Sequence, residues 1–379
     1  MTTTPEKRTA KGRRSFLKTV GAGAAAAAAG GAVLAKPNVS RAQTVVFRFQ
    51  STWPQRDIFH EYAQDYAKKV NEMSGGRLRL EVLAAGAVVG AFQLMDAVSA
   101  GALDGGHGVA AYWYGKNKAA SLFGTPAPFG WNANELLGWV NYGGGQQLYD
   151  RLLKDILKVN VVSHFYGPMP TQPFGWFRRE INSADQLRGL KYRTVGLAAD
   201  LYQALGVAVT IVPGGEIVPA MDRGLIDAAE FNNPSSDRVL GFPDVSKLYY
   251  VQSYHQVIEC FEVMFNAIKY NQLAAEQKAM LKYAAEAASA DMSWKAMDRY
   301  SKDLNEMREK QGVRVIKTPD SILQAQLQAW DQVINNLSSD PFFKEVVESQ
   351  RAWARRVVAL RQEMEVPSDV AYNHFFRRG

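Results

Sequence analysis

Short motifs in this 379-residue chain come close to catalytic and metal-binding patterns, but each lacks a residue that the chemistry needs. A His-Glu pair begins at His60 like the helix of a zinc protease, yet Gln64 stands where the second histidine ligand would be. Residues 97–101 (AVSAG) lack the first glycine of a hydrolase nucleophile turn. The histidines show no ligand spacing, at His60, His107, His164, His255 and His374. These patterns favour binding over catalysis.

Arg193 is the most informative charged residue, because it ends a predicted strand over 190–193 (LKYR). Alternation along a strand places Arg193 on the opposite face from Leu190 and Tyr192. Open α/β sheets bind ligands at the carboxyl ends of their strands, and a guanidinium can hold a carboxylate by two parallel hydrogen bonds. We therefore expect Arg193 to bind a carboxylate. A solvent-facing arginine at a strand end is the alternative that the spacing leaves open.

Aromatic residues follow two other predicted strands. Tyr112 and Trp113 come after a glycine-rich strand end at 105–109, where small residues let a ligand approach the backbone. Trp53 lies just beyond the first strand. We expect Trp53, Tyr112 and Trp113 to line a ligand cleft, with packing in the core as the alternative.

Strand and helix patterns alternate from residue 44 onward. Residues 44–50 and 77–83 have strand composition, and apolar residues recur at helical spacing over 57–73 and 92–100. This alternation predicts a parallel sheet covered by helices. A second set follows, with strands at 158–163, 190–193, 207–212 and 226–231 and helices at 197–205 and 216–223. Two α/β units are the simplest account.

The last third of the chain has helical composition. Residues 271–311 contain neither Gly nor Pro. At about 1.5 Å per residue a helix of this length reaches roughly 60 Å, so we expect it to span both units. The predicted organisation is a signal at 1–42, lobe I at 43–165 with part of 250–310, lobe II at 166–250 with part of 310–340, and a C-terminal helical extension at 340–379.

The positive charge of the chain is confined to its N-terminus. The whole sequence has 44 Lys and Arg and 37 Asp and Glu. Residues 1–43 hold eight of the basic residues and one of the acidic ones, so the remainder carries 36 of each. This balance argues against a nucleic-acid partner. The basic stretch, the uncharged run over 19–35 and the small residues around Arg41 indicate an export signal cleaved after Ala42.

Residues 12–18 (GRRSFLK) resemble the twin-arginine export signal, with Gly12 where serine is usual. The resemblance implies a bacterial protein that reaches the periplasm. This route often carries enzymes folded around redox cofactors, so an exported periplasmic enzyme is the alternative class. Cys260 is the single cysteine and is expected to be a buried apolar residue. The export signal, the neutral two-lobed body and the lack of a catalytic motif favour a periplasmic binding protein-like α/β fold, with a ligand cleft between two lobes.

Two segments resemble the solute-binding proteins of tripartite ATP-independent periplasmic (TRAP) transporters. They are 175–181 (GWFRREI) with 187–193 (LRGLKYR), and 215–230 (GEIVPAMDRGLIDAAE). The resemblance covers roughly residues 44–340 and is closest to the branch that binds 2-oxo acids with a metal ion. It implies that Arg193 holds the carboxylate of a small 2-oxo acid, such as pyruvate or a longer analogue.

The same resemblance implies a cation site. Gln172 lies four residues before Trp176, and Glu230 ends a predicted strand. In the branch, these positions bind the cation with the main-chain carbonyl of the next residue, Phe231 here, where tryptophan is expected. Hard oxygen ligands suit sodium or calcium, and a monovalent ion would balance the charges of Arg193, Glu230 and the ligand. The alternative is that Glu230 pairs with an arginine and Gln172 caps a loop.

The predicted function is that of a solute-binding subunit that delivers a small carboxylate to TRAP membrane subunits, with no bond made or broken. A different organic acid, such as lactate or a dicarboxylate, is the alternative ligand. Relatives in this branch can dimerise through exchanged C-terminal helices, and residues 340–379 offer apolar faces for such a homodimer. The same faces can also pack on the parent chain.

Overall fold

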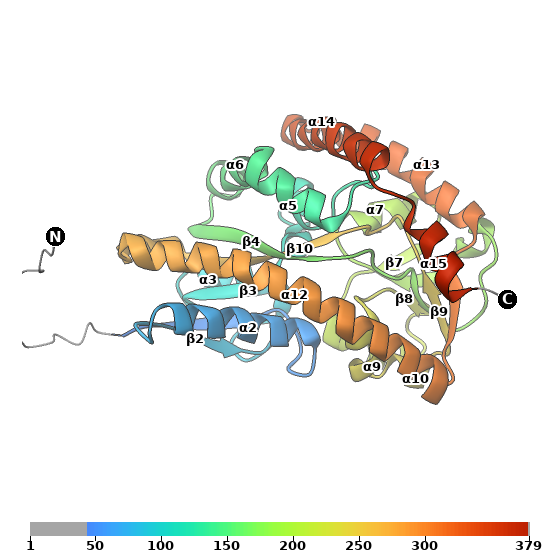
Figure 1. Ribbon diagram of the computed structural model, residues 1–379, viewed down its shortest axis with the longest axis horizontal. Helices are drawn as coiled ribbons and strands as arrows, with labels where there is room; N and C mark the ends of the chain where they lie inside the picture. The colour runs from blue at the N-terminus through green and yellow to red at the C-terminus, as the bar shows by residue number, and fades with distance from the viewer. Residues whose placement is uncertain (1–43, 378–379) are drawn as a thin grey trace, which may run out of the picture. The chain divides into compact units, whose positions relative to one another are not determined.

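A computed structural model describes residues 44–377, which belong to one compact unit (Figure 1). The predicted export signal at 1–42 lies outside the described residues. Two sheets organise the unit, one of five strands and one of six. We name the five-stranded sheet with its covering helices lobe I and the six-stranded sheet with its helices lobe II. The predicted two-lobed α/β architecture is confirmed. Within residues 44–377, no helix is long and apolar enough to cross a membrane.

The sheet of lobe I is mixed rather than parallel. Its strands are β1 (Val45–Ser51), β2 (Leu78–Leu83), β3 (Gly105–Val109), β4 (Val161–Met169) and β10 (Glu259–Asn266). They lie in the order β2-β1-β3-β10-β4. β1 pairs in parallel with β2 and β3, so that Phe49 lies opposite Val82 and Gly105. β10 is antiparallel to β3 and β4. The parallel pairing predicted for the first strands is therefore confirmed, whereas β10 makes the complete sheet mixed.

The sheet of lobe II is also mixed. Its strands are β5 (Gly175–Phe177), β6 (Lys191–Arg193), β7 (Ala208–Thr210), β8 (Ala228–Ala229), β9 (Leu248–Val251) and β11 (Arg314–Lys317), in the order β11-β9-β5-β8-β6-β7. β6 is parallel to β7 and β8, whereas β5 is antiparallel to β8 and β9. β8 is shorter than the strand predicted over 226–231, because the chain leaves the sheet at Glu230.

Two crossings between the lobes explain the antiparallel strands. The chain leaves lobe I through β4 and enters lobe II as β5, and it returns from β9 to β10. A strand that enters a lobe runs opposite to the neighbouring strand that leaves it. β10 therefore pairs antiparallel with β4, and β5 with β9. The crossing segments 170–174 and 252–258 lie between the two sheets along the chain.

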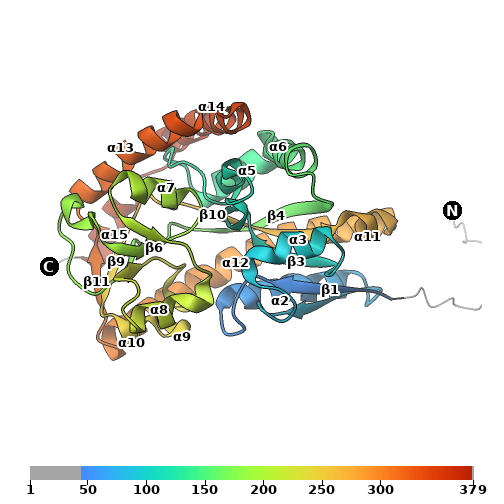
Figure 2. The same ribbon diagram turned by 180° about the vertical axis from the view of Figure 1, so that it is seen from behind.

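Helices cover both faces of the lobe I sheet, with α2 (Ile58–Met73) and α12 (Ala275–Lys310) on one face and α3 (Leu94–Ser99) on the other (Figures 1 and 2). α2 begins after Asp57, whose carboxylate accepts a hydrogen bond from the amide of Phe59. The other helices are α4 (Ser121–Gly124), α5 (Ala133–Tyr142), α6 (Gly145–Arg151), α7 (Leu197–Ala204), α8 (Ile217–Asp222), α9 (Pro234–Leu240), α10 (Phe242–Val245), α11 (Ala267–Gln272), α13 (Asp320–Leu337), α14 (Pro341–Met364) and α15 (Ser368–Phe376).

The long helix α12 connects the lobes, as predicted. Its 36 residues extend for about 54 Å at 1.5 Å per residue. Leu281 packs in the core of lobe I, whereas Met307 packs in that of lobe II. The helix starts later than the predicted 271, because extended backbone at Leu273 separates α11 from α12.

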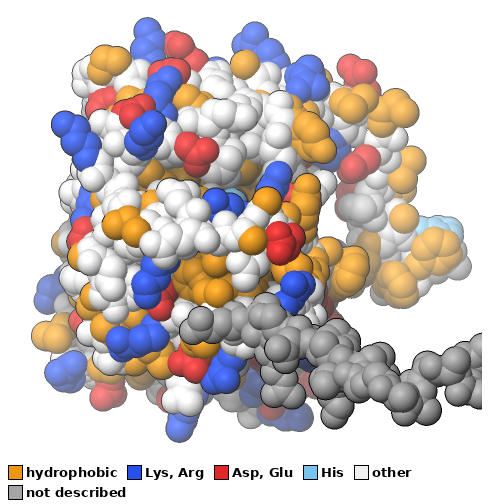
Figure 3. All heavy atoms as spheres, turned by 90° about the vertical axis from the view of Figure 1, so that its left-hand side faces the viewer, with side chains coloured by type: hydrophobic (Ala, Val, Ile, Leu, Met, Phe, Trp, Pro, Cys, Tyr) orange, Lys and Arg blue, Asp and Glu red, His pale blue; other side chains and the backbone are white. Residues whose placement is uncertain are grey.

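Of the C-terminal helices, α14 packs against the rest of the protein, whereas α15 projects from it. Asp340 caps α14 by accepting hydrogen bonds from the amides of Phe342 and Phe343. The Phe343 side chain is buried. α15 buries none of its residues. Figure 3 shows hydrophobic side chains gathered on this projecting end of the chain, at the right of the view.

A buried carboxylate anchors the interior of lobe I. Glu262 on β10 is fully buried and accepts hydrogen bonds from Trp113 Nε1 (2.5 Å), Ser163 Oγ (2.5 Å) and Tyr149 OH (2.9 Å). Burial raises the pKa of Glu262, and these hydrogen bonds act in the opposite direction. The side chain therefore joins the turn that contains Trp113 to the helix that contains Tyr149 and to β4.

We expect Glu262→Ala to lower the free energy of unfolding by about 3 kcal/mol, because the substitution leaves three buried donors without an acceptor. Glu262→Gln keeps one acceptor and should lose less. Denaturant unfolding of both variants checks this, with exposed Glu286→Ala as a control that should stay within about 0.5 kcal/mol of the parent. An Ala variant as stable as the control would contradict the assignment.

Candidate functional site

Arg193 lies at the carboxyl end of β6 and is almost completely buried, with 1% of its side chain exposed. Its Nε donates to the carbonyl oxygen of Val212 (2.9 Å), and its Nη1 donates to Glu230 Oε1 (2.9 Å) and to the Glu230 carbonyl (3.2 Å). Nη2 has no hydrogen-bond partner in the protein. One edge of the guanidinium is therefore fixed by lobe II, while the other nitrogen is buried with its hydrogen-bonding capacity unused.

Glu230 follows β8, next to β6 in the sheet, and its side chain is fully buried. The Glu230–arginine pair that the sequence left open is present, but it uses only one carboxylate oxygen, and Oε2 has no partner. Burial raises the pKa of Glu230 to about 7, against the opposing effect of the Arg193 charge. The pair is thus incompletely satisfied, which is costly for buried charges.

Gln172 comes from the crossing between β4 and β5. Its Nε2 donates to Asn232 Oδ1 (3.2 Å) and lies 3.4 Å from Glu259 Oε2. The Gln172 carbonyl oxygen Oε1 is buried and has no partner. The side chain therefore links the crossing to the turn after Glu230 and leaves one oxygen acceptor free, which differs from a simple loop cap.

Glu259 is a member of the site that the sequence reasoning missed. It starts β10 and is buried, with 2% exposed. Burial and the neighbouring charge of Glu230 raise the pKa of Glu259 to about 8. A signal was present, because Glu259 and Glu262 are the two acids of a strand that is apolar over its other residues up to Phe265. Buried acids need a partner or a ligand. Glu262 has its donors in the core, so Glu259 is the one that requires another explanation.

Unpartnered polar atoms accompany these residues on four segments, at residue 172 and at 193–194, 230–232 and 255–256. Buried polar groups in folded proteins are almost always hydrogen-bonded, so several exceptions together indicate the place of a ligand. They are Arg193 Nη2, Thr194 Oγ1, Glu230 Oε2, Asn232 Nδ2, Gln172 Oε1, His255 Nε2 and both side-chain polar atoms of Gln256. Donors for an anion and oxygen acceptors for a cation are both present. The residues therefore fit an anionic ligand bound with a hard cation.

Phe231 holds its side chain in the core of lobe II. The ring is 1% exposed and stacks on Phe242 with 5.9 Å between centroids. The Arg193 guanidinium carbon lies 5.8 Å from the centroid of the Phe231 ring. A Cβ on Gly214 would meet this ring at 2.3 Å, so glycine is required there. The side chain supports Arg193 from the core side.

Tyr112 and Trp53 are neighbouring rings of lobe I, and the indole nitrogen of Trp53 donates to His107 Nδ1 (2.9 Å) within that lobe. Burial raises the pKa of Tyr112, and the charges of Arg193, Glu259 and Glu230 also act on its hydroxyl. Trp53 packs against Tyr112 with 5.5 Å between centroids. Both rings are almost fully buried.

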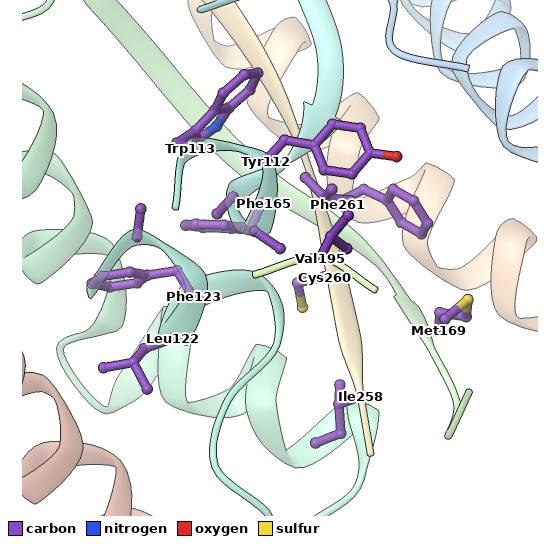
Figure 4. Close-up of a cluster of buried hydrophobic side chains, with 14 of the residues drawn as sticks. Tyr112, Trp113, Leu122, Phe123, Phe165, Met169, Val195, Ile258, Cys260 and Phe261 are labelled. Atoms are coloured by element: carbon purple, nitrogen blue, oxygen red, sulfur yellow. The ribbon is translucent and has the colours of Figure 1, made fainter. Parts of the chain in front are cut away.

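Trp113 lies elsewhere. Its indole nitrogen donates to Glu262 inside lobe I, and Figure 4 shows Tyr112 and Trp113 pointing apart. The two residues share a 3₁₀ turn over Ala110–Trp113, in which successive side chains are rotated by about 120°. The expectation that Trp113 lines the cleft is therefore corrected, and the core-packing alternative describes it. Its indole nitrogen is occupied by Glu262.

Hydrogen bonds connect the two lobes around this cluster. Ser236 Oγ on α9 donates to Asp57 Oδ1 at the start of α2 (2.6 Å), and both side chains are buried. The amide of Leu197 donates to Ser121 Oγ (3.0 Å). Tyr114 OH donates to Asp200 Oδ2 (2.7 Å). The lobes are therefore in contact through several hydrogen bonds, as in a closed binding protein.

Comparison with known proteins identifies the family. Residues 49–340 match the family of bacterial extracellular solute-binding proteins, family 7. This chain belongs to that family. A monocarboxylate 2-oxoacid-binding periplasmic protein from Nostoc sp. (strain PCC 7120) is 33% identical to it over 326 residues, covering 85% of this chain and 87% of the relative. The resemblance to TRAP solute-binding proteins predicted from the sequence is thus confirmed at the level of the family.

Solved structures share the family 7 fold. A TRAP periplasmic solute-binding protein from Colwellia psychrerythraea, with bound calcium and pyruvate, is 31% identical, has a TM-score of 0.80, and aligns over 88% of this chain and 100% of its own. A TRAP periplasmic solute-binding protein from Pseudoalteromonas atlantica, with bound sodium and pyruvate, is 29% identical, with a TM-score of 0.80 and the same coverage.

The buried acids of this family 7 protein predict how its stability depends on pH. The pKa values of Glu230 and Glu259 are about 7 and about 8, above the ordinary 4.5, so the folded chain holds protons that the unfolded chain releases. Burial lowers the pKa values of His107, His164 and His255, which act in the opposite direction below about 6.5. We therefore expect the thermal midpoint of the ligand-free protein to fall as pH rises from about 6.5 to about 8. Asp237, whose pKa burial raises to about 7, acts in the same direction. Thermal unfolding across this pH range measures the slope.

Variants separate the two glutamates from the other groups. The double variant Glu230→Gln, Glu259→Gln should have a shallower slope than the parent, while exposed Glu286→Gln should keep the parent slope. A midpoint that rises with pH in the parent, or an unchanged slope in the double variant, would contradict the assignment.

Proposed function

We propose that this protein is the periplasmic solute-binding subunit of a TRAP transporter, and that it captures a small 2-oxo acid together with sodium or calcium for delivery to the membrane subunits. On this proposal it makes and breaks no bond of its ligand. The observation that carries the proposal is the buried Arg193–Glu230 pair, in which one donor nitrogen and one acceptor oxygen are both unused. The names of the Nostoc relative and of the two solved structures support the ligand class.

Arg193 is the proposed carboxylate receptor. Val212 and Glu230 hold its Nε and Nη1, so the guanidinium is already oriented before the ligand arrives. This preorganisation reduces the entropy lost on binding. The free Nη2 offers a charge-assisted hydrogen bond to the ligand carboxylate. On this proposal Tyr112, on whose hydroxyl the Arg193 charge acts, borders the ligand from lobe I, and Trp53 packs behind the Tyr112 ring.

Gln172, Glu230 and the carbonyl of Phe231 are the proposed cation ligands. The free Oε1 of Gln172 and the free Oε2 of Glu230 are the donors that support this assignment. A bound cation would add positive charge beside the carboxylate and oxo oxygens of the ligand. Glu259 supplies a further acidic oxygen close to Gln172.

Glu259 changes the charge balance expected from the sequence. When Glu259 is protonated, the charges of Arg193, Glu230 and the ligand carboxylate sum to −1, and a monovalent cation neutralises them. With Glu259 ionised, the cluster has one more negative charge, and a divalent ion balances it. Both sodium and calcium are therefore compatible with the charges of this chain. The charge balance without Glu259 would favour a monovalent ion over calcium.

The proposed lobe boundaries lie close to those of the sheets, although β4 of lobe I continues to Met169 and β9 of lobe II to Val251. Residues 43–165 with part of 250–310 belong to lobe I, and 166–250 with part of 310–340 belong to lobe II. The hinge then consists of the two crossings and α12. Ligand contacts from Arg193 in lobe II and Tyr112 in lobe I would favour the closed arrangement over an open one.

Thermal unfolding of residues 43–379 with a panel of 2-oxo, 2-hydroxy and dicarboxylic acids tests the function. A 2-oxo acid at 100 times its dissociation constant should add about 2.7 kcal/mol of stability, seen as a higher midpoint. The shift should vanish when sodium and calcium are removed. Arg193→Lys should nearly abolish the shift without loss of the fold, because a lysine cannot reproduce the fixed guanidinium edge.

Other outcomes of the same panel would favour a site without a cation, another ligand class or an enzyme. A full shift of the thermal midpoint without cations would agree with Arg193 as the carboxylate receptor but would refute the cation site. In that case, added sodium or calcium should not change the midpoint of Glu230→Ala. A shift with dicarboxylates alone would replace the ligand class. Turnover of any acid would identify an exported enzyme, and wild-type affinity in Arg193→Lys would refute the receptor role.

The proposed partner of the C-terminal extension is a second copy of the chain. α15 leaves Val370, Phe375 and Phe376 between 64% and 75% exposed, which is unusual for a soluble monomer. Trp294 and Met297 on α12 are 65% and 66% exposed beside a groove of about 690 Å³. Two apolar surfaces without a partner in one chain support pairing between copies.

We expect sedimentation analysis to give a dimer mass for the parent and a monomer mass for the double variant Phe375→Ser, Phe376→Ser, because serine removes the apolar contact. Tyr142→Ser is the control, since Tyr142 is 88% exposed at the end of α5, away from this surface. A monomeric parent would refute the dimer.

A further inference from the structure

Asp237 contacts the turn that follows Glu230, and it is fully buried. It belongs to the first turn of α9, four residues after Asn233, which caps this helix. Its Oδ1 accepts hydrogen bonds from the backbone amides of Asn232 (3.2 Å) and Asn233 (3.4 Å), and its Oδ2 accepts one from Trp176 Nε1 (2.8 Å). Both carboxylate oxygens of Asp237 are therefore used within lobe II, unlike those of Glu230.

The hydrogen bond to Asn232 acts on a peptide group that the proposed cation site uses. The amide nitrogen of Asn232 and the carbonyl of Phe231 belong to the same peptide bond, and none of the described residues 44–377 has a cis peptide. In a trans peptide the N–H and C=O bonds point in opposite directions. The Phe231 carbonyl therefore points away from Asp237. Within the same range, the structure shows no hydrogen bond to this carbonyl oxygen.

A carboxylate on the N–H side also strengthens the Phe231 carbonyl as a ligand. Peptide resonance places partial negative charge on the oxygen and partial positive charge on the nitrogen. A negative charge beside the N–H favours this form, because hydrogen-bonded groups polarise one another. Groups behind a metal ligand orient it and raise its basicity in this way. Asp237 therefore fixes the direction of the Phe231 carbonyl and increases the negative charge on its oxygen.

Asp237 is also connected to the second proposed oxygen ligand, Gln172. The Asn232 side chain accepts a hydrogen bond from Gln172 Nε2 (3.2 Å), and this leaves Gln172 Oε1 without a partner. Trp176, which bonds to Asp237 Oδ2, lies on β5 four residues after Gln172. One carboxylate thus joins the turn at 231–233 to the segment that contains Gln172.

We propose that Asp237 is a positioning residue for the cation, whose carboxylate orients and polarises the Phe231 carbonyl and so sets the affinity of the site for sodium or calcium. The inference rests on the proposed cation site. The hydrogen bonds of Arg193 go to Val212 and Glu230 instead, so the carboxylate receptor does not depend on Asp237.

The alternative is that Asp237 only caps α9. An acid in the first turn of a helix commonly accepts a hydrogen bond from the amide at the helix start, as Asp237 does from Asn233. Loss of a cap alone would lower the stability of the protein. It would not change the concentration of cation that the ligand-bound protein requires.

Calorimetric titration of calcium at saturating pyruvate, in a sodium-free buffer, tests the proposal. Asp237→Asn keeps the shape of the side chain and one carbonyl acceptor but removes the charge. It should weaken calcium binding about tenfold or more. Pyruvate titrated at saturating calcium should keep its dissociation constant within about threefold, because saturation removes the contribution of cation binding.

Asp303→Asn is the matched control. Asp303 is also buried and pairs with α9, since its Oδ1 lies 3.0 Å from Arg238 Nη2. This variant should lower the thermal midpoint of the ligand-free protein, because it weakens a largely buried ion pair. Its calcium affinity should stay within about twofold of the parent value, because its carboxylate acts away from the turn at 231–233. Unfolding of both variants without ligand separates stability from cation affinity.

Selective labelling provides a measurement on the parent protein, which serves even where Asp237→Asn does not fold. The sequence has two Phe-Asn pairs, Phe231–Asn232 and Phe265–Asn266. Phenylalanine with a ¹³C carbonyl and ¹⁵N asparagine therefore give one NMR signal for each pair. The Asn232 amide proton should lie at low field, as expected beside a carboxylate. Calcium with pyruvate should move the Phe231–Asn232 signal and leave the Phe265–Asn266 signal in place.

The outcomes separate this inference from the function on which it rests. Parent calcium affinity in Asp237→Asn, an equal loss in Asp303→Asn, or a Phe231 carbonyl signal that calcium does not move would overturn the positioning role and keep the solute-binding function. Pyruvate binding that needs no cation would overturn the cation site and this inference with it. A parent that binds none of the 2-oxo acids would overturn the proposed function as well. Loss of calcium affinity in Asp237→Asn alone, with pyruvate affinity kept at saturating calcium, supports the proposal.

Discussion

The buried Arg193–Glu230 pair is the constraint on which the site depends. Removing two charges from water is costly, and their mutual attraction compensates for this only when the remaining hydrogen-bonding positions are also satisfied. Here each partner keeps one unused atom. The carbonyls of Val212 and Glu230 fix the guanidinium but do not complete it. An anion bound to the arginine and a cation bound to the glutamate would offset the free-energy cost of burying this incompletely hydrogen-bonded pair.

The fold brings this pair together through neighbouring strands and two crossings. Arg193 and Glu230 end adjacent strands of lobe II, so their side chains meet at one edge of the sheet. Gln172 comes from the first crossing between the lobes, and Glu259 starts β10 directly after the second crossing. Movement of the lobes about these crossings therefore also moves the oxygens of the proposed cation site. Binding chemistry and hinge position are physically coupled in this arrangement.

The sequence predicted the two-lobed α/β class, the long helix and the neighbourhood of Arg193, Glu230 and Gln172, because alternating patterns and strand-end positions are local signals. It did not predict the antiparallel direction of β10, which depends on the path between lobes. It also missed Glu259, since strand composition alone does not show which buried acid lacks internal donors. Trp113 was placed in the cleft because adjacent aromatic residues look equivalent until the turn that separates their directions is known.

The hydrogen bonds between lobes have a consequence for the timing of transport. Ser236 to Asp57 and Leu197 to Ser121 are contacts that the protein makes with itself when closed. If the proposed ligand leaves by opening of the lobes, these hydrogen bonds must break first, although the ligand takes no part in them. Affinity differences among related complexes arise mostly from dissociation rates. Residence time is then set partly by the lobes, and a membrane subunit that competes for Asp57 or Ser121 would release cargo without touching it.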